Sequence, residues 1–171
     1  MRPLRLLSAC LVLLVSGGCA GYKLGPANGL TAGEKTIQVN PFSNQTLEPR
    51  LGDAVTIALR NGLQRDGTFR LSTHGRPDVA VSGVITRYNR QELSFLPKDV
   101  LTVQDYRVSL TAQVTAREVN TGKVLLDGVE VKGYALVRVG SDLTSAERQA
   151  KPLMAEDLAR NVTALLVDGS W

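Results

Sequence analysis

The sequence has almost none of the residues from which metal centres and nucleophilic sites are usually built. Among its 171 residues it has one histidine, His74, and two cysteines. No HExxH or CxxC spacing occurs, and His74 lies beside Gly75 in a predicted loop, so a Ser-His-Asp set has no well-placed base. Glu156 and Asp157 are adjacent on a predicted helix, and their side chains therefore diverge. These absences predict a protein that is not an enzyme and that needs no metal or other cofactor.

The chain also lacks a dense basic patch. Its 20 Lys and Arg residues are interspersed with 16 Asp and Glu residues, which gives a formal net charge of only +4. Proteins that bind nucleic acid usually gather their cations on one face or along one helix. The scattered charges therefore predict that nucleic acid is not a partner.

No apolar run is long enough to span a bilayer, which takes about 20 residues, but a shorter run opens the chain. Two arginines lie in the first five residues, Leu6–Val15 is almost wholly apolar, and three small residues precede Cys19. This order is typical of a signal peptide, and a cysteine directly after the small residues is typical of lipoprotein processing. We therefore predict a lipoprotein signal peptide at residues 1–18 and lipid attachment to Cys19.

Such processing has consequences for the mature chain. Cys10 leaves with the signal peptide, so no thiol remains for a disulfide, a metal or catalysis. Three acyl chains on Cys19, palmitate among them, exceed the two lipid signals that stable anchoring requires. Ala20 follows the cysteine, where Asp would favour retention in the inner membrane of enteric bacteria. We therefore expect the protein at the periplasmic face of the outer membrane.

The rest of the chain predicts one α+β domain. Residues 19–35 are rich in glycine and are interpreted as a lipidated tether, whereas residues 36–171 form the folded domain. Alternating apolar and polar residues predict strands, and the covered and polar faces indicate a mainly antiparallel sheet. The predicted strands are Thr36–Phe42, Asp78–Phe95, Tyr106–Ala116 and one that begins at Val124; Phe69–Ser72 is either a short strand or an approach to one.

Two amphipathic helices complete the predicted fold. The first is capped by Thr46, has Pro49 in its first turn and ends near Asp66-Gly67. The second begins at a capping box of Thr144 and Glu147, and Pro152 should kink or divide it. Their apolar stripes predict two helices on one face of a mixed, mainly antiparallel four-stranded sheet. The stripe residues are Leu51, Val55, Leu59 and Leu63, and then Met154, Leu158, Val162 and Leu165.

Two local signals mark the last strands. Asn120-Thr121-Gly122 is typical of a hairpin turn. After it the apolar parity switches from Val124 and Leu126 to Val129, and a bulge at Asp127-Gly128 explains the switch.

Several segments together resemble one known family. The chain resembles the lipopolysaccharide-assembly lipoprotein family, LptE, although it has one more residue between cysteine and tyrosine, and Pro152 is unusual there. The segments that carry the resemblance are Gly21-Tyr22-Lys23-Leu24 after Cys19, Pro41–Pro49, Asp78–Ile85, Asp105–Val108 and Asn120–Leu125.

The resemblance implies a function. It implies an outer-membrane lipoprotein that plugs and helps assemble the LptD-type β-barrel translocon and that assists lipopolysaccharide insertion into the outer leaflet. It also implies that lipopolysaccharide contacts cations in two connections of the sheet. Because alternate connections of successive antiparallel strands lie at the same end, Lys98 and Arg138 are the candidates, and we expect both within reach of one ligand.

A different class of function stays open. Lipoproteins that activate a cell-wall synthase or form a subunit of a secretion pore also begin with a strand, a Phe-x-Asn-x-Thr turn and a helix, as at Phe42–Thr46. The long hairpin after Asp78 favours the first reading.

Cys19→Ala should abolish lipid labelling and leave the precursor uncleaved by the lipoprotein signal peptidase, because the thiol that accepts the diacylglycerol is gone. Labelling with radioactive palmitate, together with membrane fractionation, measures both effects. Cys10→Ala is the control and should be labelled and cleaved normally. Labelled, membrane-bound protein in the Cys19 variant would overturn the prediction.

Overall fold

The longest apolar–polar alternation in the chain forms a long strand of the sheet, as predicted. This strand, β5 (Asp99–Glu118), pairs antiparallel with β4 (Val79–Leu96) on one side and with β6 (Val124–Arg138) on the other. Its alternate apolar residues from Val108 to Ala116 are fully buried, because successive side chains of a strand point to opposite faces. One face of the sheet is therefore apolar and the other polar.

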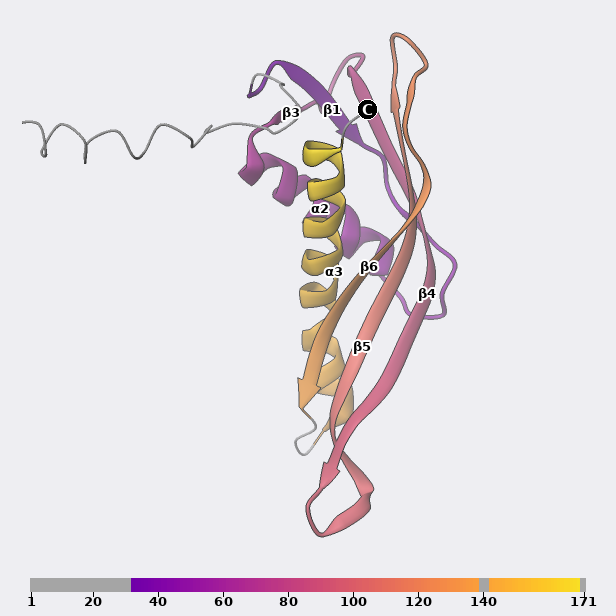
Figure 1. Cartoon of the computed structure of the whole chain (residues 1–171), viewed down its shortest axis with the longest axis vertical. Coiled ribbons are helices and arrows are strands. Elements are labelled where there is room, and N and C mark those ends of the chain that lie inside the picture. Colours follow the sequence, from indigo (N-terminus) through magenta and orange to yellow (C-terminus); the bar gives the residue numbers. More distant parts are fainter. Residues whose placement is uncertain (1–31, 139–141, 170–171) are drawn as a thin grey trace, which may run out of the picture.

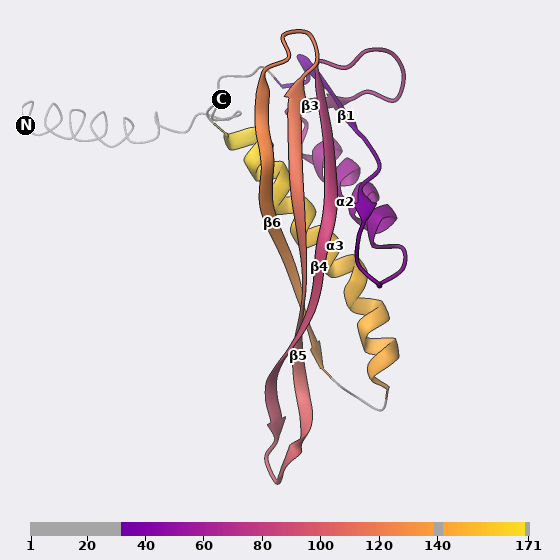
Figure 2. The ribbon, with the colours of Figure 1, turned by 90° about the vertical axis from the view of Figure 1, so that its right-hand side faces the viewer.

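The computed structural model describes residues 32–138 and 142–169. The predicted signal peptide at residues 1–18, the lipidation site Cys19 and most of the tether lie outside the described residues, as does Trp171. Figures 1 and 2 show a twisted sheet with two helices on one of its faces, as predicted for the α+β class. The hairpin of β4 and β5 extends beyond β6 at one end (Figure 1).

The prediction of four strands is wrong, because the sheet has six strands within the described residues. The additional strands are β2 (Ser43–Asn44) and β3 (Phe69–Leu71), beside β1 (Lys35–Val39). The order is β3-β1-β4-β5-β6, and β2 also pairs with β4. The β1–β3, β1–β4 and β2–β4 pairs are parallel, so the sheet is mixed, with its long pairs antiparallel.

β2 was not predicted, and Phe69–Ser72 was left open between a short strand and an approach to one, for the same physical reason. β2 has two residues and β3 has three, and alternation over so few positions cannot be distinguished from a loop. The parallel pairing follows from α2 (Leu51–Asp66), which lies between β1 and β3 in the chain. A helix between two strands carries the chain back, so that the second strand runs in the same direction as the first.

α2 ends where predicted, but its start and its cap differ from the prediction: Pro49, expected in the first turn, lies before the helix. Arg50, at φ 65°, occupies the N-cap position and makes no capping hydrogen bond with its side chain. The Thr46 hydroxyl instead donates to Asn44 at 2.8 Å and accepts from the Glu48 N–H at 3.3 Å. The Thr46 side chain is therefore used by a turn that precedes the helix, and the capping prediction is wrong.

The cap of α3 (Leu143–Asp168) also differs from the prediction. The Asp142 carboxylate accepts the N–H groups of Thr144 at 2.9 Å and Ser145 at 3.2 Å, so Asp142 is the N-cap and Thr144 lies inside the helix. A carboxylate also interacts favourably with the positive end of the helix dipole. Glu147 does not reach back to the cap, because it pairs with Arg90 of β4.

Pro152 does not divide α3, which is one helix of 26 residues. The proline ring is exposed to solvent, and buried residues on both sides of it attach the helix to the sheet and to α2. This tertiary packing retains the helical backbone despite the hydrogen bond that proline cannot make. The buried stripe is Met154, Leu158 and Val162, as predicted, followed by Leu166 where Leu165 was expected.

Both local predictions near β6 are confirmed. In the Asn120–Gly122 turn the glycine has φ 73°, and its N–H donates to the Glu118 carbonyl at 2.9 Å. In β6 the register shifts at Asp127-Gly128, where two residues face one residue of β5. Gly128 has φ 59°, and its N–H donates to the Thr115 hydroxyl at 3.3 Å.

The contact between α3 and β6 depends on Gly133. A methyl group at this position would overlap the backbone of Met154 and Leu158. Only the absence of a side chain allows the helix to lie directly against the strand.

Gly133→Ala should destabilise the protein by about 1–3 kcal/mol, the usual effect of inserting a methyl group into a packed core. Gly62→Ala is the matched control, because the new methyl would lie 3.2 Å from the Thr163 hydroxyl. At Gly62 the gain of about 1 kcal/mol in helix propensity should offset this closer contact. Equilibrium unfolding in urea, followed by circular dichroism, compares the two. Equal stability of both variants would contradict the close approach at Gly133.

Candidate functional site

The structure places the two predicted ligand-binding cations at the same end of the sheet, but not side by side. Lys98 lies in the exposed turn between β4 and β5, and Arg138 is the last residue of β6. Arg138 is opposite Asp105, whereas β5 begins at Asp99. At about 3.4 Å per residue, the hairpin therefore extends roughly 20 Å beyond Arg138. Figure 1 shows this extension of β4 and β5 past the end of β6.

Arg138 is not a free cation. Its Nε donates to Asp105 Oδ1 at 3.0 Å, and its side chain is 75% exposed. The Ser94 hydroxyl donates to the other Asp105 oxygen at 2.6 Å. The pKa of Asp105 is lowered first by the Ser94 hydrogen bond and then by Arg138, and the pKa of Arg138 is raised by the same carboxylate. Because exposed ion pairs contribute little, an incoming anion can compete with Asp105 for Arg138.

The sheet face opposite the helices combines cations with apolar side chains. Arg107 lies over the Tyr134 ring, with 5.4 Å between the guanidinium carbon and the ring centroid. Tyr134 and Leu136 are 54% and 63% exposed. Lys132 pairs with Glu130 on the same strand at 3.0 Å. This face therefore offers both positive charge and apolar area to an anionic amphiphile.

Sequence reasoning missed this outer face as a candidate. The alternation in Tyr106–Ala116 indicates that Arg107 faces away from the core. It does not indicate which residues of β6 lie beside Arg107, because that depends on the register beyond the bulge at Asp127-Gly128. A side-chain pair across two strands is visible only when the register is known.

A second group of charges ties α3 to β4 and to the loop after β2. Arg90 pairs with Glu147, and Lys151 pairs with Glu48 at 2.7 Å. The hydroxyl of Tyr88 is buried beside these pairs. Burial raises the pKa of Tyr88 most, and the charges of Glu147 and Glu48 raise it further.

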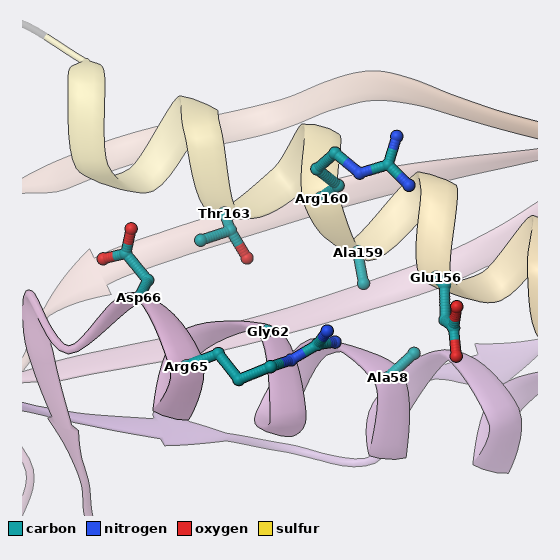
Figure 3. A pocket seen from close by; sticks show the side chains of 8 residues that line it. All are labelled: Ala58, Gly62, Arg65, Asp66, Glu156, Ala159, Arg160 and Thr163. Atoms are coloured by element: carbon teal, nitrogen blue, oxygen red, sulfur yellow. The ribbon is translucent and has the colours of Figure 1, made fainter.

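A cavity of about 260 Å³ lies between α2 and α3 (Figure 3). Arg65, Asp66, Glu156 and Arg160 line it, so the two charges of each sign balance. Its lining also contains small side chains, and the Thr163 hydroxyl faces Gly62. The cavity therefore has no excess charge with which to select an ion.

The remaining titratable candidates that the structure describes, His74, Glu156 and Asp157, lie in different surroundings. His74 is exposed, with its Nδ1 2.9 Å from the Thr73 hydroxyl. Glu156 is exposed at the α2–α3 cavity, whereas Asp157 accepts the Tyr134 N–H at 3.1 Å. Within residues 32–138 and 142–169, no group of three or more His, Cys, Asp or Glu side chains is placed to hold a metal ion. No helix in these ranges combines the length and the apolar character needed to cross a bilayer.

Comparison with known proteins identifies a family. The family model described as "LptE: Lipopolysaccharide-assembly" matches residues 34–166. Protein XCC0632 from Xanthomonas campestris has a similar structure, with a TM-score of 0.58 and 9% identity over 85% of this chain and 90% of that one. The hypothetical protein CT253 from Chlamydia trachomatis has a TM-score of 0.55 and 13% identity over 80% of this chain and 96% of that one. At these identities the likeness shows the fold alone. No curated protein sequence matches the chain.

Proposed function

The chain belongs to the LptE family of lipopolysaccharide-assembly proteins, and we propose that it is an outer-membrane lipoprotein that plugs and helps assemble an LptD-type β-barrel. The observation that carries this proposal is the extent of the family match, which begins just before β1 and ends in the last turns of α3. In the same proposal, residues 1–18 are the signal peptide, Cys19 carries the lipid and residues 19–35 form the tether.

The ion pairs among the described residues support a role without catalysis. Asp105 pairs with Arg138, Arg90 with Glu147 and Glu48 with Lys151. Each pair joins two elements of the fold, and the lowered pKa of Asp105 follows from that pairing and from the Ser94 hydrogen bond. A protein that acts through many surface contacts requires such fixed geometry and no reactive group.

Lipopolysaccharide is the ligand that we propose for Lys98 and Arg138. Its phosphates favour Lys and Arg through charge-assisted hydrogen bonds, and its acyl chains favour exposed apolar surface. Because roughly 20 Å of hairpin separates the two cations, they contact different parts of the lipid. The outer-face residues Arg107, Tyr134 and Leu136 lie close to Arg138 in β5 and β6 and extend this surface.

Co-purification tests the partner. The lipoprotein, extracted from its own bacterium in mild detergent through an affinity tag, should retain an LptD-type barrel protein in near-equal amount. Mass spectrometry identifies the partner and measures the ratio. Recovery of a cell-wall synthase, or of a ring of identical lipoprotein copies without a barrel, would replace the proposed function with the alternative class.

Lys98→Asp combined with Arg138→Asp should weaken lipopolysaccharide binding about tenfold or more at low salt, where surface charges are least screened. The expected loss is that of two exposed charge pairs at up to about 1 kcal/mol each, since a tenfold change corresponds to about 1.4 kcal/mol. Binding of the purified protein to labelled lipopolysaccharide measures the effect. The control is Arg117→Asp with Lys123→Asp, the same change of charge near the opposite end of the sheet. Equal losses in both double variants would remove Lys98 and Arg138 from the site.

A further inference from the structure

Among the described residues the sheet has two long strand edges, those of β4 and β6, and α3 covers part of the β6 edge. At the outer edge of β6, the Tyr134 N–H donates to Asp157 at 3.1 Å, and Asn161 donates to the Lys132 carbonyl at 2.8 Å. Both of these side chains come from α3. Native proteins block exposed edges in this way, because unpaired N–H and C=O groups pair readily with another chain.

The corresponding edge of β4 is covered only in its first part. Asn40 donates its N–H to the Val81 carbonyl at 2.9 Å, and Gln45 donates its N–H to the Ile85 carbonyl at 3.0 Å. β1 and β2 thus occupy the edge as far as Ile85. From Thr86 to Leu96, no strand of the described residues pairs with this side of β4.

The register shows which backbone groups of β4 point outward. The N–H and C=O groups of Lys132 point away from β5, since its carbonyl binds Asn161 of α3. Thr111 of β5 is opposite Lys132. The N–H and C=O groups of Thr111 therefore point away from β6, towards β4. Thr111 is in turn opposite Arg87, so the N–H and C=O of Arg87 point towards β5. These directions alternate along a strand, so the N–H and C=O groups of Tyr88 point outward, and so do those of every second residue after Tyr88. The residues with outward groups are Tyr88, Arg90 and Glu92.

A cavity of about 580 Å³ lies beside this open edge. One wall is five consecutive residues of β4, Thr86–Arg90, and the other is the loop Gln45–Glu48. The Glu48–Lys151 ion pair holds that loop against α3. The cavity therefore lies along β4 directly beyond the end of β2, and it leaves space beside the unpaired backbone of β4.

The side chains at the cavity indicate what it accepts. Arg87 is exposed and forms no ion pair with a residue that the structure describes. A cation beside an open strand edge is complementary to an extended peptide that carries a carboxylate.

We propose that the edge of β4 from Thr86 to Glu92 receives an extended, carboxylate-bearing segment of the barrel partner as an added strand. The identity of the partner rests on the proposed function. Main-chain hydrogen bonds to Tyr88, Arg90 and Glu92 would supply the affinity, and Arg87 would select the acidic side chain. Because Asp157 and Asn161 of α3 bind backbone groups of the β6 edge, such pairing would be directed to the β4 edge.

Glu92→Pro is the variant that tests the added strand, because it removes an outward N–H and leaves the ladder with β5 intact. Co-purification of the barrel protein should fall about fivefold, the effect expected from one backbone hydrogen bond. Glu130→Pro is the matched control, because it makes the same change of residue and removes an outward N–H from the β6 edge two residues before Lys132, and barrel recovery should be unchanged. Circular dichroism and urea unfolding establish that both variants fold.

Hydrogen exchange of backbone amides tests the added strand on the unchanged protein, without a variant. In the free protein the outward amides of Tyr88, Arg90 and Glu92 should exchange faster than those of the residues between them, whose N–H groups face β5. In the barrel complex these three amides should slow about tenfold or more, as expected for hydrogen-bonded amides. Fragment mass spectrometry resolves the individual amides.

The outcomes separate this inference from the proposed function. If the unchanged lipoprotein retains no barrel, the proposed function fails and the partner assignment fails with it. If it retains the barrel while Glu92→Pro binds equally well and the three amides stay fast, only the added strand is overturned. Protection of these amides in a dimer of the lipoprotein without the barrel would also overturn the proposal, because a second copy would then be the occupant.

Discussion

The direct contact between α3 and the backbone of β6 at Gly133 is the constraint on which the rest of the fold depends. Because no side chain separates the two elements there, Asp157 and Asn161 reach the strand edge and cover it. The helix then runs diagonally behind the sheet (Figure 2). The carboxyl end of α3 lies behind β6, and the amino end of α3 lies towards β4. This diagonal brings Glu147 to Arg90 and allows α2 to pack beside α3.

The parts of the fold that local sequence determines were predictable. β5 shows its exposed and buried faces in one unbroken run of alternating residues, and α2 shows its stripe in residues spaced four apart, so neither requires knowledge of a neighbour. Thr46 and Thr144 were assigned as caps from the same kind of local pattern, and both assignments are wrong. Asn44 binds the Thr46 hydroxyl in a turn before α2, and Asp142 takes the N–H groups at the start of α3, so in both cases a nearby side chain competes with the assigned cap. Cap identity depends on that competition, which spacing alone does not resolve.

The candidate site was predictable only in part for a related reason. Strand order alone places Lys98 and Arg138 at one end of the sheet, as the structure does. Their separation depends on where β6 stops relative to β5, and the Asp105–Arg138 pair depends on register. The outer-face pair of Arg107 and Tyr134 depends on the bulge at Asp127-Gly128 as well. Long-range register, which local sequence encodes weakly, determines which polar residues meet.

The irregularity in β4 at Thr86 restricts how this hairpin can change in length. Before it, Val81 and Ile85 face the helices; after it, the residues on that face are Tyr88 and Arg90. One extra residue thus exchanges the two faces of everything that follows. An insertion or deletion of a single residue between Thr86 and Tyr88 would turn the helix-facing side chains outwards and break the link of Arg90 to Glu147. An insertion of two residues there would keep both side chains on the helix-facing side and would lengthen the hairpin without exchanging its faces.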